Sequence, residues 1–244
     1  MKNLKLFVLV LLAGFGLTGC IIDIDGDGIG SCIRANGPTV TEVLDIAQFD
    51  GLDLQIPADV FITQGPNFEV RVEGQENAVE QLDRDVRNGF WEIEFDRCMR
   101  NLDDFRVFIT MPDITELYVS GSGVIIGDNI FVTGDLTLGV SGSGSIDVGL
   151  ESDDVDTRIS GSGDIRLEGV ADDVRHRTSG SGDLFAFNLE SNTSDITISG
   201  SGDAEVFVKE ELTIRISGSG DVFYKGRPSL NASVSGSGRI IDAN

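Results

Sequence analysis

The sequence predicts an all-β fold, a parallel β-helix or solenoid of about seven regular coils with two strands in each coil. The tetrapeptide Ser-Gly-Ser-Gly occurs seven times, beginning at residues 120, 141, 160, 179, 199, 217 and 235. The intervals of 18 to 21 residues match the length of one stacked supersecondary unit. The segments between the tetrapeptides alternate between apolar and polar residues, whereas a flexible Gly/Ser linker would show no such pattern.

The first strand of each coil is predicted from the alternation before the turn. The residue directly before the tetrapeptide, and the residues two and four positions earlier, are mostly β-branched or aliphatic. The residues between them are mostly polar, and a period of two places the apolar residues on one buried face. The positions directly before the tetrapeptide are Val119, Val140, Ile159, Thr178, Ile198, Ile216 and Val234.

The second strand of each coil follows the turn, where the alternation resumes. Glycine suits the turn because tight corners need a positive φ, which costs energy for a residue with a side chain. Stretches such as "EGVADD" (168–173) and "NLESNTSD" (188–195) are predicted to close the opposite edge. Like strands then stack on like strands, which gives two parallel sheets around an apolar core. The second residue after each tetrapeptide faces that core: Ile125, Ile146, Ile165, Leu184, Ala204, Val222 and Ile240.

The folded domain is predicted to span residues 39–244, with an irregular N-terminal part at 39–112 and the regular repeats at 113–244. Val79, Leu82 and Val86 lie at helical spacing and predict one short helix within "ENAVEQLDRDVR", covering the N-terminal core or an edge. Strands of the N-terminal part are predicted in "LDLQI", "DVFITQ", "FEVRVE", "FWEIEF" and "FRVFIT".

Residues 1–19 have the features of a lipoprotein signal peptide. Lys2 and Lys5 flank an apolar stretch, "LFVLVLLAGFG", that is too short to span a bilayer comfortably. The small residues of "LTGC" lead into Cys20, which matches the lipobox of bacterial lipoproteins and predicts cleavage before Cys20 and attachment of diacylglycerol, carrying chains such as palmitate, to its sulfur. The alternative is an ordinary signal peptide that happens to contain a cysteine.

The mature chain would begin with a polar tether at residues 20–38. Ile21 follows the lipidated cysteine, and by analogy with enterobacterial sorting it favours the outer membrane. The envelope of a bacterium, with anchoring in the outer membrane through lipid, is therefore the predicted location.

The charge of the chain excludes some partners. The formal net charge is −23, and removal of residues 1–19 deletes two lysines and no acid, which gives −25. So acidic a surface repels nucleic acid and anionic headgroups. No nucleic-acid partner is expected, and membrane attachment has to come from the lipid.

Two cysteines, Cys32 and Cys98, remain in the exported part of the chain. Disulfides form in oxidising compartments, so these two can pair. Such a bond would tie down the first strand of the domain.

The residues give no support for catalysis. His176 is the only histidine, which excludes a Ser-His-Asp triad and a multi-histidine metal site. The alignment of the repeats places His176 on the inward column, as a buried neutral histidine bonded to a threonine or to backbone. No cofactor and no catalytic residue are predicted.

An acidic residue follows four of the turns directly: Asp164, Asp183, Asp203 and Asp221. In a solenoid these carboxylates stack in one column. We expect each to accept a hydrogen bond from a turn amide. The weaker alternative is a calcium site between rungs, although like charges at rung spacing repel by only about 0.9 kcal/mol in water and do not require a cation.

The outward residues differ between the two sheets. Before the turn they are mostly charged, with Arg158, Arg177 and Arg215 near Asp156 and Asp195, which indicates a solvated, charge-paired face. After the turn they include phenylalanines, which a solvated face does not need. We expect Phe187 to lie beside Phe207 and the rings to form one apolar contact surface, unless a loop or the short helix covers them. The candidate contact residues are Phe185, Phe187, Phe207 and Phe223.

Several stretches together resemble the GIN-domain family, whose members are labelled auto-transporter adhesin heads: "FDGLDLQIPADVFITQG", "FEVRVEG", "VRNGFWEIEF" and the repeated "ISGSGDI". The resemblance covers roughly residues 40–242. It implies a right-handed parallel β-helix and a role at the cell surface, and it carries over no catalytic residue.

The sequence therefore predicts a non-catalytic envelope lipoprotein that binds, adheres or acts as a scaffold. Its partner would be a protein, a polysaccharide or a second copy of the chain. The alternatives are a polysaccharide-active β-helix enzyme, which would work in an acid-lined groove, and a purely structural component of the envelope.

Overall fold

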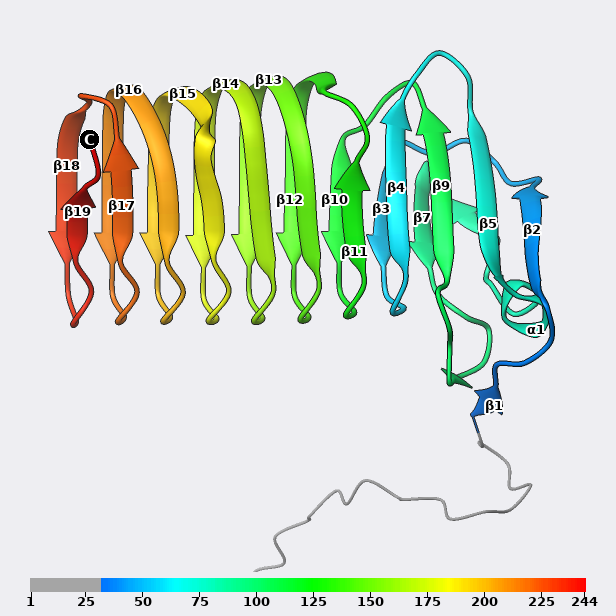
Figure 1. The fold of residues 1–244 in the computed structure, drawn as a ribbon. Coiled ribbons are helices and arrows are strands. Elements are labelled where there is room, and N and C mark those ends of the chain that lie inside the picture. Colours follow the sequence, from blue (N-terminus) through cyan, green and yellow to red (C-terminus); the bar gives the residue numbers. More distant parts are fainter. Residues whose placement is uncertain (1–31) are drawn as a thin grey trace, which may run out of the picture. The chain divides into compact units, whose positions relative to one another are not determined.

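Parallel strands stacked coil upon coil make up most of the computed structural model, which describes residues 32–244 (Figure 1). The signal peptide, Cys20 and residues 20–31 of the tether lie outside the described residues. The compact unit spans Cys32–Asn244, so residues 32–38, expected to belong to the tether, lie within it.

The regular coils form a parallel β-solenoid, as predicted. Equivalent residues of successive repeats are paired in the sheets: Leu138 with Thr157, Thr157 with His176, and so on to Ala232. The strands of this part are β10 (Glu116–Val119), β11 (Val124–Gly127), β12 (Phe131–Val140), β13 (Ser145–Ile159), β14 (Asp164–Thr178), β15 (Leu184–Ile198), β16 (Ala204–Ile216), β17 (Val222–Lys225), β18 (Ser229–Val234) and β19 (Ile240–Asp242).

The edge opposite the Ser-Gly-Ser-Gly turns differs from the prediction. The stretches 168–173 and 188–195 do not interrupt the strands, because β14 and β15 run continuously from one sheet around this edge into the other. A gradual bend keeps the ladder hydrogen bonds, so no loop is needed. Register shifts between Ala186 and Glu190 and between Ser191 and Thr193 absorb the unequal repeat lengths. We call this edge the bend edge.

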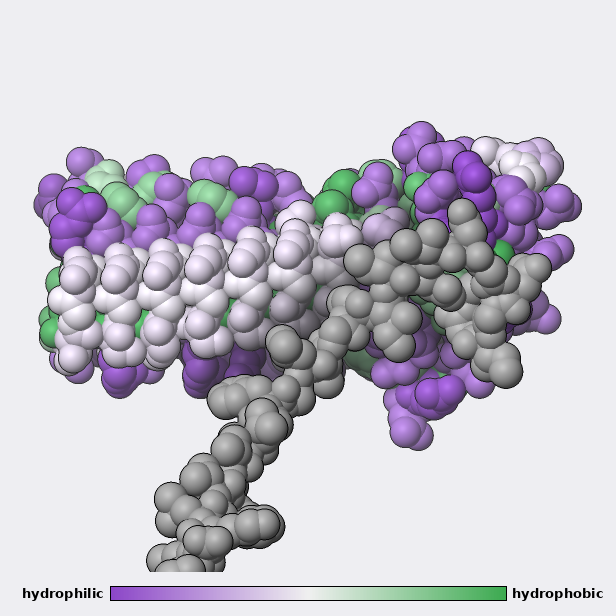
Figure 2. Space-filling model, turned by 90° about the horizontal axis from the view of Figure 1, so that it is seen from below, coloured by the Kyte–Doolittle hydropathy of each residue, from purple (hydrophilic) through white to green (hydrophobic). Residues whose placement is uncertain are grey.

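The turn edge has the predicted tetrapeptides, but glycine is needed there for another reason. Of the glycines in the seven tetrapeptides, only Gly236 has a positive φ. The turns instead stack so closely that a Cβ on Gly161 would lie 2.0 Å from the carbonyl oxygen of Gly142. Figure 2 looks onto this edge and shows the stacked turns as a pale ridge between more hydrophilic flanks. The serines of the ridge are exposed to solvent.

The N-terminal part continues the solenoid but in a different chain order. β3 (Gly51–Leu54) and β4 (Asp59–Gln64) form a coil that pairs with β10 and β11 on one side. On the other side the same coil pairs with β7 (Phe90–Ile93) and β9 (Arg106–Met111). The chain therefore builds the second coil of the stack first, adds the outer coil, and then returns to start the regular repeats.

Antiparallel strands and the short helix occupy the N-terminal end of the solenoid (Figure 1). β5 (Glu69–Gln75) pairs antiparallel with β9, and β2 (Thr39–Leu44) pairs antiparallel with β5. α1 (Glu76–Val79) packs beside both strands. The five strands predicted for the N-terminal part are confirmed by β3, β4, β5, β7 and β9.

The helix is shorter than predicted. Val79 and Leu82 are buried as expected, but Val86 lies in β6 (Val86–Arg87), which pairs with β7. The backbone carbonyl of Asp83 also accepts a hydrogen bond from Trp91 Nε1 at 3.1 Å. Pairing with β7, whose Trp91 and Ile93 side chains are fully buried, thus overrides the helical spacing of the sequence.

A disulfide joins Cys32 to Cys98. Beside it, β1 (Ile33–Arg34) pairs with β8 (Met99–Arg100) in a separate two-stranded sheet. The bond thus holds the first described residue against a loop 66 residues later in the chain.

Candidate functional site

Four phenylalanines lie on the outer face of the sheet that follows the turns, and we call them the Phe surface. Phe185 and Phe187 belong to β15, Phe207 belongs to β16 and Phe223 to β17. The neighbouring residues Leu184, Ala186, Val206 and Val222 point into the core. Each ring of the Phe surface is half-buried, so the outward direction expected for them is correct.

The four rings do not form the continuous apolar area that was expected. The register shift in β15 places Phe207 opposite Glu190 rather than beside Phe187. In the neighbouring column, Glu205 lies between Phe185 and Phe223. None of the ring-to-ring contacts found in residues 32–244 joins two members of the Phe surface. The expected pairing failed because β15 has extra residues that a simple count from the turn ignores.

Cationic side chains cover part of the Phe surface. The guanidinium of Arg166 lies 4.9 Å from the ring centre of Phe185, and Lys225 Nζ lies 4.2 Å from the ring centre of Phe187. Such cation–π contacts stabilise a partly exposed pair by about 0.5–1 kcal/mol. A hollow of about 170 Å³ lies between Phe185, Phe187 and Glu205. The surface therefore alternates single rings with charged groups.

The same face carries a second aromatic site that sequence reasoning missed. Phe61 of β4 and Phe108 of β9 stack with ring centres 5.2 Å apart, and the guanidinium of Arg71 lies 4.0 Å from the ring centre of Phe108. Both rings come from the same four letters, Val-Phe-Ile-Thr, at 60–63 and 107–110. This repeated tetrapeptide could have indicated the second aromatic site from the sequence, because identical alternation in two paired strands places both rings on one face.

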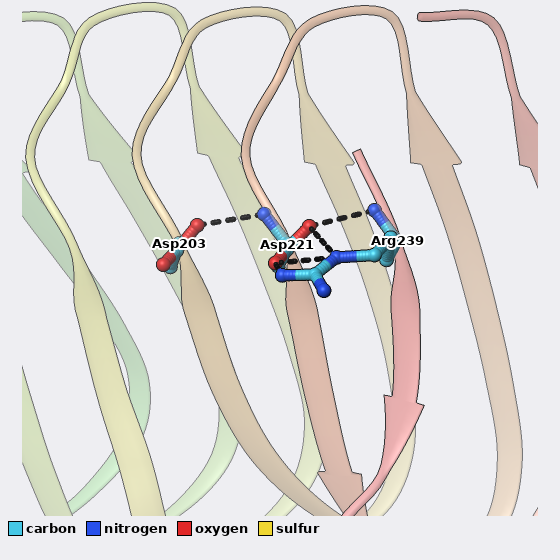
Figure 3. Close-up of polar contacts among 3 residues, drawn as sticks. All are labelled: Asp203, Asp221 and Arg239. Atoms are coloured by element: carbon cyan, nitrogen blue, oxygen red, sulfur yellow. Dashed lines mark hydrogen bonds and ion pairs between the residues drawn. The ribbon is translucent and has the colours of Figure 1, made fainter. Parts of the chain in front are cut away.

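The Asp column comprises Asp164, Asp183, Asp203 and Asp221, and hydrogen bonds connect it along the solenoid. The first three carboxylates each accept the backbone N–H of the next aspartate, at 2.9 Å for Asp183 N–H and at 2.6 Å for Asp203 N–H. Figure 3 shows the end of the column, where Asp203 accepts the N–H of Asp221 at 2.7 Å. A turn amide was expected to be the donor. The donor is instead the backbone N–H of the next aspartate.

Arg239 occupies the next position of the column (Figure 3). Its backbone N–H donates to Asp221 Oδ1 at 2.7 Å, and its guanidinium pairs with the Asp221 carboxylate at 2.5 Å. The guanidinium hydrogen bond lowers the pKa of Asp221 below its usual range. The last carboxylate of the column is therefore neutralised by a cation of the chain itself.

The sheet before the turns has the charge-paired outer face that was predicted. Arg177 pairs with Asp156 at 3.4 Å and Arg215 pairs with Asp195 at 2.8 Å. A hollow of about 260 Å³ lies between Tyr118 and Arg158, above Gly139. Burial, followed by the nearby Glu116 carboxylate, raises the pKa of Tyr118.

A hollow of about 440 Å³ follows the bend edge. It is lined by carboxylates, by the exposed valines Val132 and Val170, and by Lys209, which pairs with Glu190 at 2.9 Å. The groove is open and mostly polar. The carboxylates of its lining are Glu151, Asp153, Asp172 and Glu190.

His176 lies in the core, as predicted. Its Nδ1 is 2.7 Å from Thr157 Oγ1 and its Nε2 is 2.6 Å from Thr178 Oγ1. Burial, with a smaller effect of Arg177, lowers the pKa of His176 to about 3. The imidazole is therefore neutral at physiological pH, and it serves the packing of the core.

In the part of the chain that the structure describes, no three histidine, cysteine or carboxylate side chains are grouped closely enough to hold a metal ion. Among the helical residues of 32–244, no helix is both long and apolar enough to cross a membrane.

Solved structures with this fold come from Bacteroides fragilis and from two species of Parabacteroides. A "putative adhesin" from Bacteroides fragilis has a TM-score of 0.80 and 24% identity, covering 85% of this chain and 98% of that chain. A "putative adhesin" from Parabacteroides merdae has a TM-score of 0.70 and 20% identity, with coverage of 86% and 99%. A "putative lipid binding protein" from Parabacteroides distasonis has a TM-score of 0.68 and 20% identity, with coverage of 87% and 100%.

No curated protein matches the chain. A family model described as "Putative auto-transporter adhesin, head GIN domain" matches residues 48–228. That range contains the N-terminal coils, the Phe surface and the Asp column. The chain belongs to the GIN-domain family.

Proposed function

We propose that this chain is a non-catalytic binding module of the bacterial cell envelope, and that the outer face of the sheet after the turns contacts its ligand. The observation that carries the proposal is the placing of aromatic rings outside the core on this face. A chain with a net charge of −23 has enough polar residues for a solvated face, yet phenylalanines stand at these outward positions. Aromatic rings supply much of the contact area and energy at binding surfaces.

The spacing of the rings favours a polysaccharide over a protein. Hot spots of protein interfaces cluster at the centre of a contact, where they are fully removed from water. Here Glu205 lies between Phe185 and Phe223, and cations lie over Phe185 and Phe187. A chain of sugar rings offers repeated small apolar faces flanked by hydroxyls, which fits single rings alternating with charged hydrogen-bonding groups.

Attachment to the outer membrane through lipid on Cys20 is part of the same proposal. The lipobox "LTGC" and the acidic charge of the chain support it, because a surface this acidic gains nothing from anionic headgroups. A lipid anchor would hold the binding face at the cell envelope, which agrees with the adhesin description of the family.

The proposal is tested by capture of envelope polysaccharides and envelope proteins, in separate reactions, on the immobilised protein. Retention of polysaccharide that is abolished by changes in the Phe surface is the expected result. Retention of proteins alone would contradict the ligand class. Binding that is unaffected by the Phe surface would contradict the proposed face.

The groove at the bend edge favours one alternative function, cleavage of a polysaccharide. Glycoside hydrolysis needs two carboxyl groups on either side of the bond, and this groove contains Glu151, Asp153 and Asp172. Incubation of the retained polysaccharide with the protein, with and without calcium, distinguishes the two functions. New reducing ends would show an enzyme, and an unchanged chain length is expected for a binding module.

A further inference from the structure

The C-terminal end of the solenoid presents unpaired strand edges. Within residues 32–244, the residue pairings of β18 are with β16 alone, and those of β19 are with β17 alone. No element lies beyond these strands in Figure 1, whereas antiparallel strands and α1 occupy the N-terminal end. An exposed edge of this kind offers free N–H and C=O groups to another strand.

The apolar columns of the core also reach this end. Leu212, Ile214 and Ile216 of β16 are fully buried. Their partners on β18 are Leu230, Ala232 and Val234, and all three are exposed, with Leu230 at 43% and Val234 at 45%. The last coil therefore leaves a row of core-facing side chains uncovered.

The orientation of the backbone can be followed from the last turn. Ser235 N–H donates to Ile216 O at 2.7 Å, so its hydrogen bond points towards the preceding coil. Backbone groups alternate along a parallel ladder, so Ser233 and Asn231 also face β16. The N–H and C=O of Ala232 consequently face the open edge, at the centre of β18.

The part of the open edge formed by β18 lacks the features that keep sheet edges apart. The sequence of β18, "SLNASV", has no charged residue and no proline, whereas β13, β14, β15 and β16 each contain at least two carboxylates. Arg239 ends the Asp column, so the last carboxylate there is already paired (Figure 3). Natural edges are usually blunted by charges, prolines or bulges. β18 is therefore an uncharged strand at the end of a strongly acidic chain.

We propose that a second copy of this chain docks on this end, so that β18 of the two copies pairs antiparallel about a twofold axis. Two chains of net charge −23 repel each other wherever carboxylates face carboxylates. Pairing through the uncharged β18 avoids that repulsion, and a copy of the same coil has the sheet spacing needed to continue both sheets. The contact is isologous, because the same patch serves both copies and closes the assembly at two. This inference does not rest on the proposed binding function.

Sedimentation equilibrium of the full chain tests the contact directly. We expect wild type to form a dimer and Ala232→Asp to be monomeric. Residue 232 is exposed in a single copy. In the pair, the two introduced carboxylates would be buried against each other and would repel. The melting temperature of the variant, measured in the monomeric concentration range, should stay near that of wild type. Val43→Asp is the matched control, since Val43 is 60% exposed on β2, the edge strand of the other end, and it should remain dimeric.

Wild type that stays monomeric at every concentration would overturn the proposal, and so would a dimer that survives Ala232→Asp. Loss of the dimer in Val43→Asp would place the contact at the N-terminal end and contradict the proposal. Assemblies of more than two copies would contradict the twofold closure. If Ala232→Asp fails to fold, Ala232→Cys decides, because the two copies of residue 232 lie directly opposite each other across the proposed twofold axis. A disulfide-linked dimer on a non-reducing gel, not seen for Val43→Cys, is expected, and its absence overturns the contact.

Discussion

The backbone N–H of Asp221 donates to the carboxylate of Asp203 at 2.7 Å, one coil away along the solenoid. The same bond recurs from Asp203 to Asp183 and from Asp183 to Asp164. The aspartate after each turn thus serves as both donor and acceptor, through its backbone and its side chain. This arrangement explains why the residue recurs without any need for a cation.

Calcium should therefore change the stability of the protein very little. Each carboxylate of the Asp column already has an N–H partner, and millimolar calcium should leave the melting temperature nearly unchanged. Asp203→Asn keeps an acceptor oxygen for Asp221 N–H and should cost little, whereas Asp203→Ala should lower the free energy of unfolding by about 1 kcal/mol. A large calcium-dependent stabilisation that Asp203→Asn removes would revive the calcium alternative.

Acid should destabilise the fold partly through His176. Its pKa is about 3 in the folded protein and near 6.5 in an exposed chain, so the unfolded state binds an extra proton between these values. The stabilising contribution is complete above pH 6.5 and is lost as the pH falls towards 3, with a slope of up to about 1.4 kcal/mol per pH unit.

His176→Ile, which copies the residue at position 196 of the same column, should remove that dependence. The free energies of unfolding of both proteins are measured by urea denaturation from neutral pH down to about pH 5, above the usual pKa of carboxyl groups. As the pH falls, the free energy of unfolding of wild type should decrease relative to that of His176→Ile. A difference that stays constant would show that His176 is not buried in its neutral form.

Glycine at the turn edge should be intolerant of alanine because of stacking, not because of φ. A Cβ on Gly161 would lie 2.0 Å from Gly142 O, and a backbone oxygen cannot move aside cheaply. We expect Gly161→Ala to lower the free energy of unfolding by about 3 kcal/mol or more.

Gly134→Ala provides the matched control for the turn substitution. The nearest atom to a Cβ at Gly134 is the Asp153 carboxylate oxygen at 3.9 Å, and Gly134 is exposed. The free energy of unfolding of Gly134→Ala should differ from that of wild type by about 0.5 kcal/mol or less. Equal losses in denaturant unfolding of the two variants would mean that the turns are not stacked as closely as described.

Lipidation should depend on Cys20. Cys20→Ala should abolish incorporation of radioactive palmitate and leave an unprocessed precursor or a form that is soluble without detergent. Cys32→Ala is a suitable control, because Cys32 pairs with Cys98 in the folded unit and should not affect labelling. Palmitate labelling that persists in Cys20→Ala would show that the lipoprotein assignment is wrong.

Much of the solenoid could be predicted because its repeats give the register directly. The inward column through Thr157, His176 and Ile196 was found by counting back from the turn, and the sheet pairs these residues. The order of the N-terminal coils could not be found, because nothing local shows that β3 pairs with β10 rather than starting the stack. That choice depends on packing between segments far apart in the sequence.

Counting forward from the turn was less reliable than counting back. Between Ala186 and Glu190 the register shifts, so Phe207 meets Glu190 and not Phe187. A bulge adds residues to one strand and is decided by how the bend edge packs, which alternation alone does not reveal. The Asp column was found because it directly follows the turn, before any bulge. The Phe surface lies further along, where the errors accumulate.

The Phe surface should act as a contact site for the ligand. Phe187 and Phe207 are half-buried and stand on the outer face, so their replacement by serine should remove contact area without opening the core. The double variant Phe187→Ser/Phe207→Ser should melt within a few degrees of wild type, because substitutions at outward positions cost little. It should nevertheless lose capture of polysaccharide, because rings are the groups of this face that supply apolar contact.

Tyr118→Ser is the matched control for the double variant. Tyr118 is also half-buried and outward, but it lies on the charge-paired sheet before the turns, so its loss should leave capture unchanged. Unfolding of Phe187→Ser/Phe207→Ser would show that the rings belong to the core. Equal loss of capture in Tyr118→Ser would move the contact site to the opposite sheet, where the hollow between Tyr118 and Arg158 becomes the place to look for the ligand.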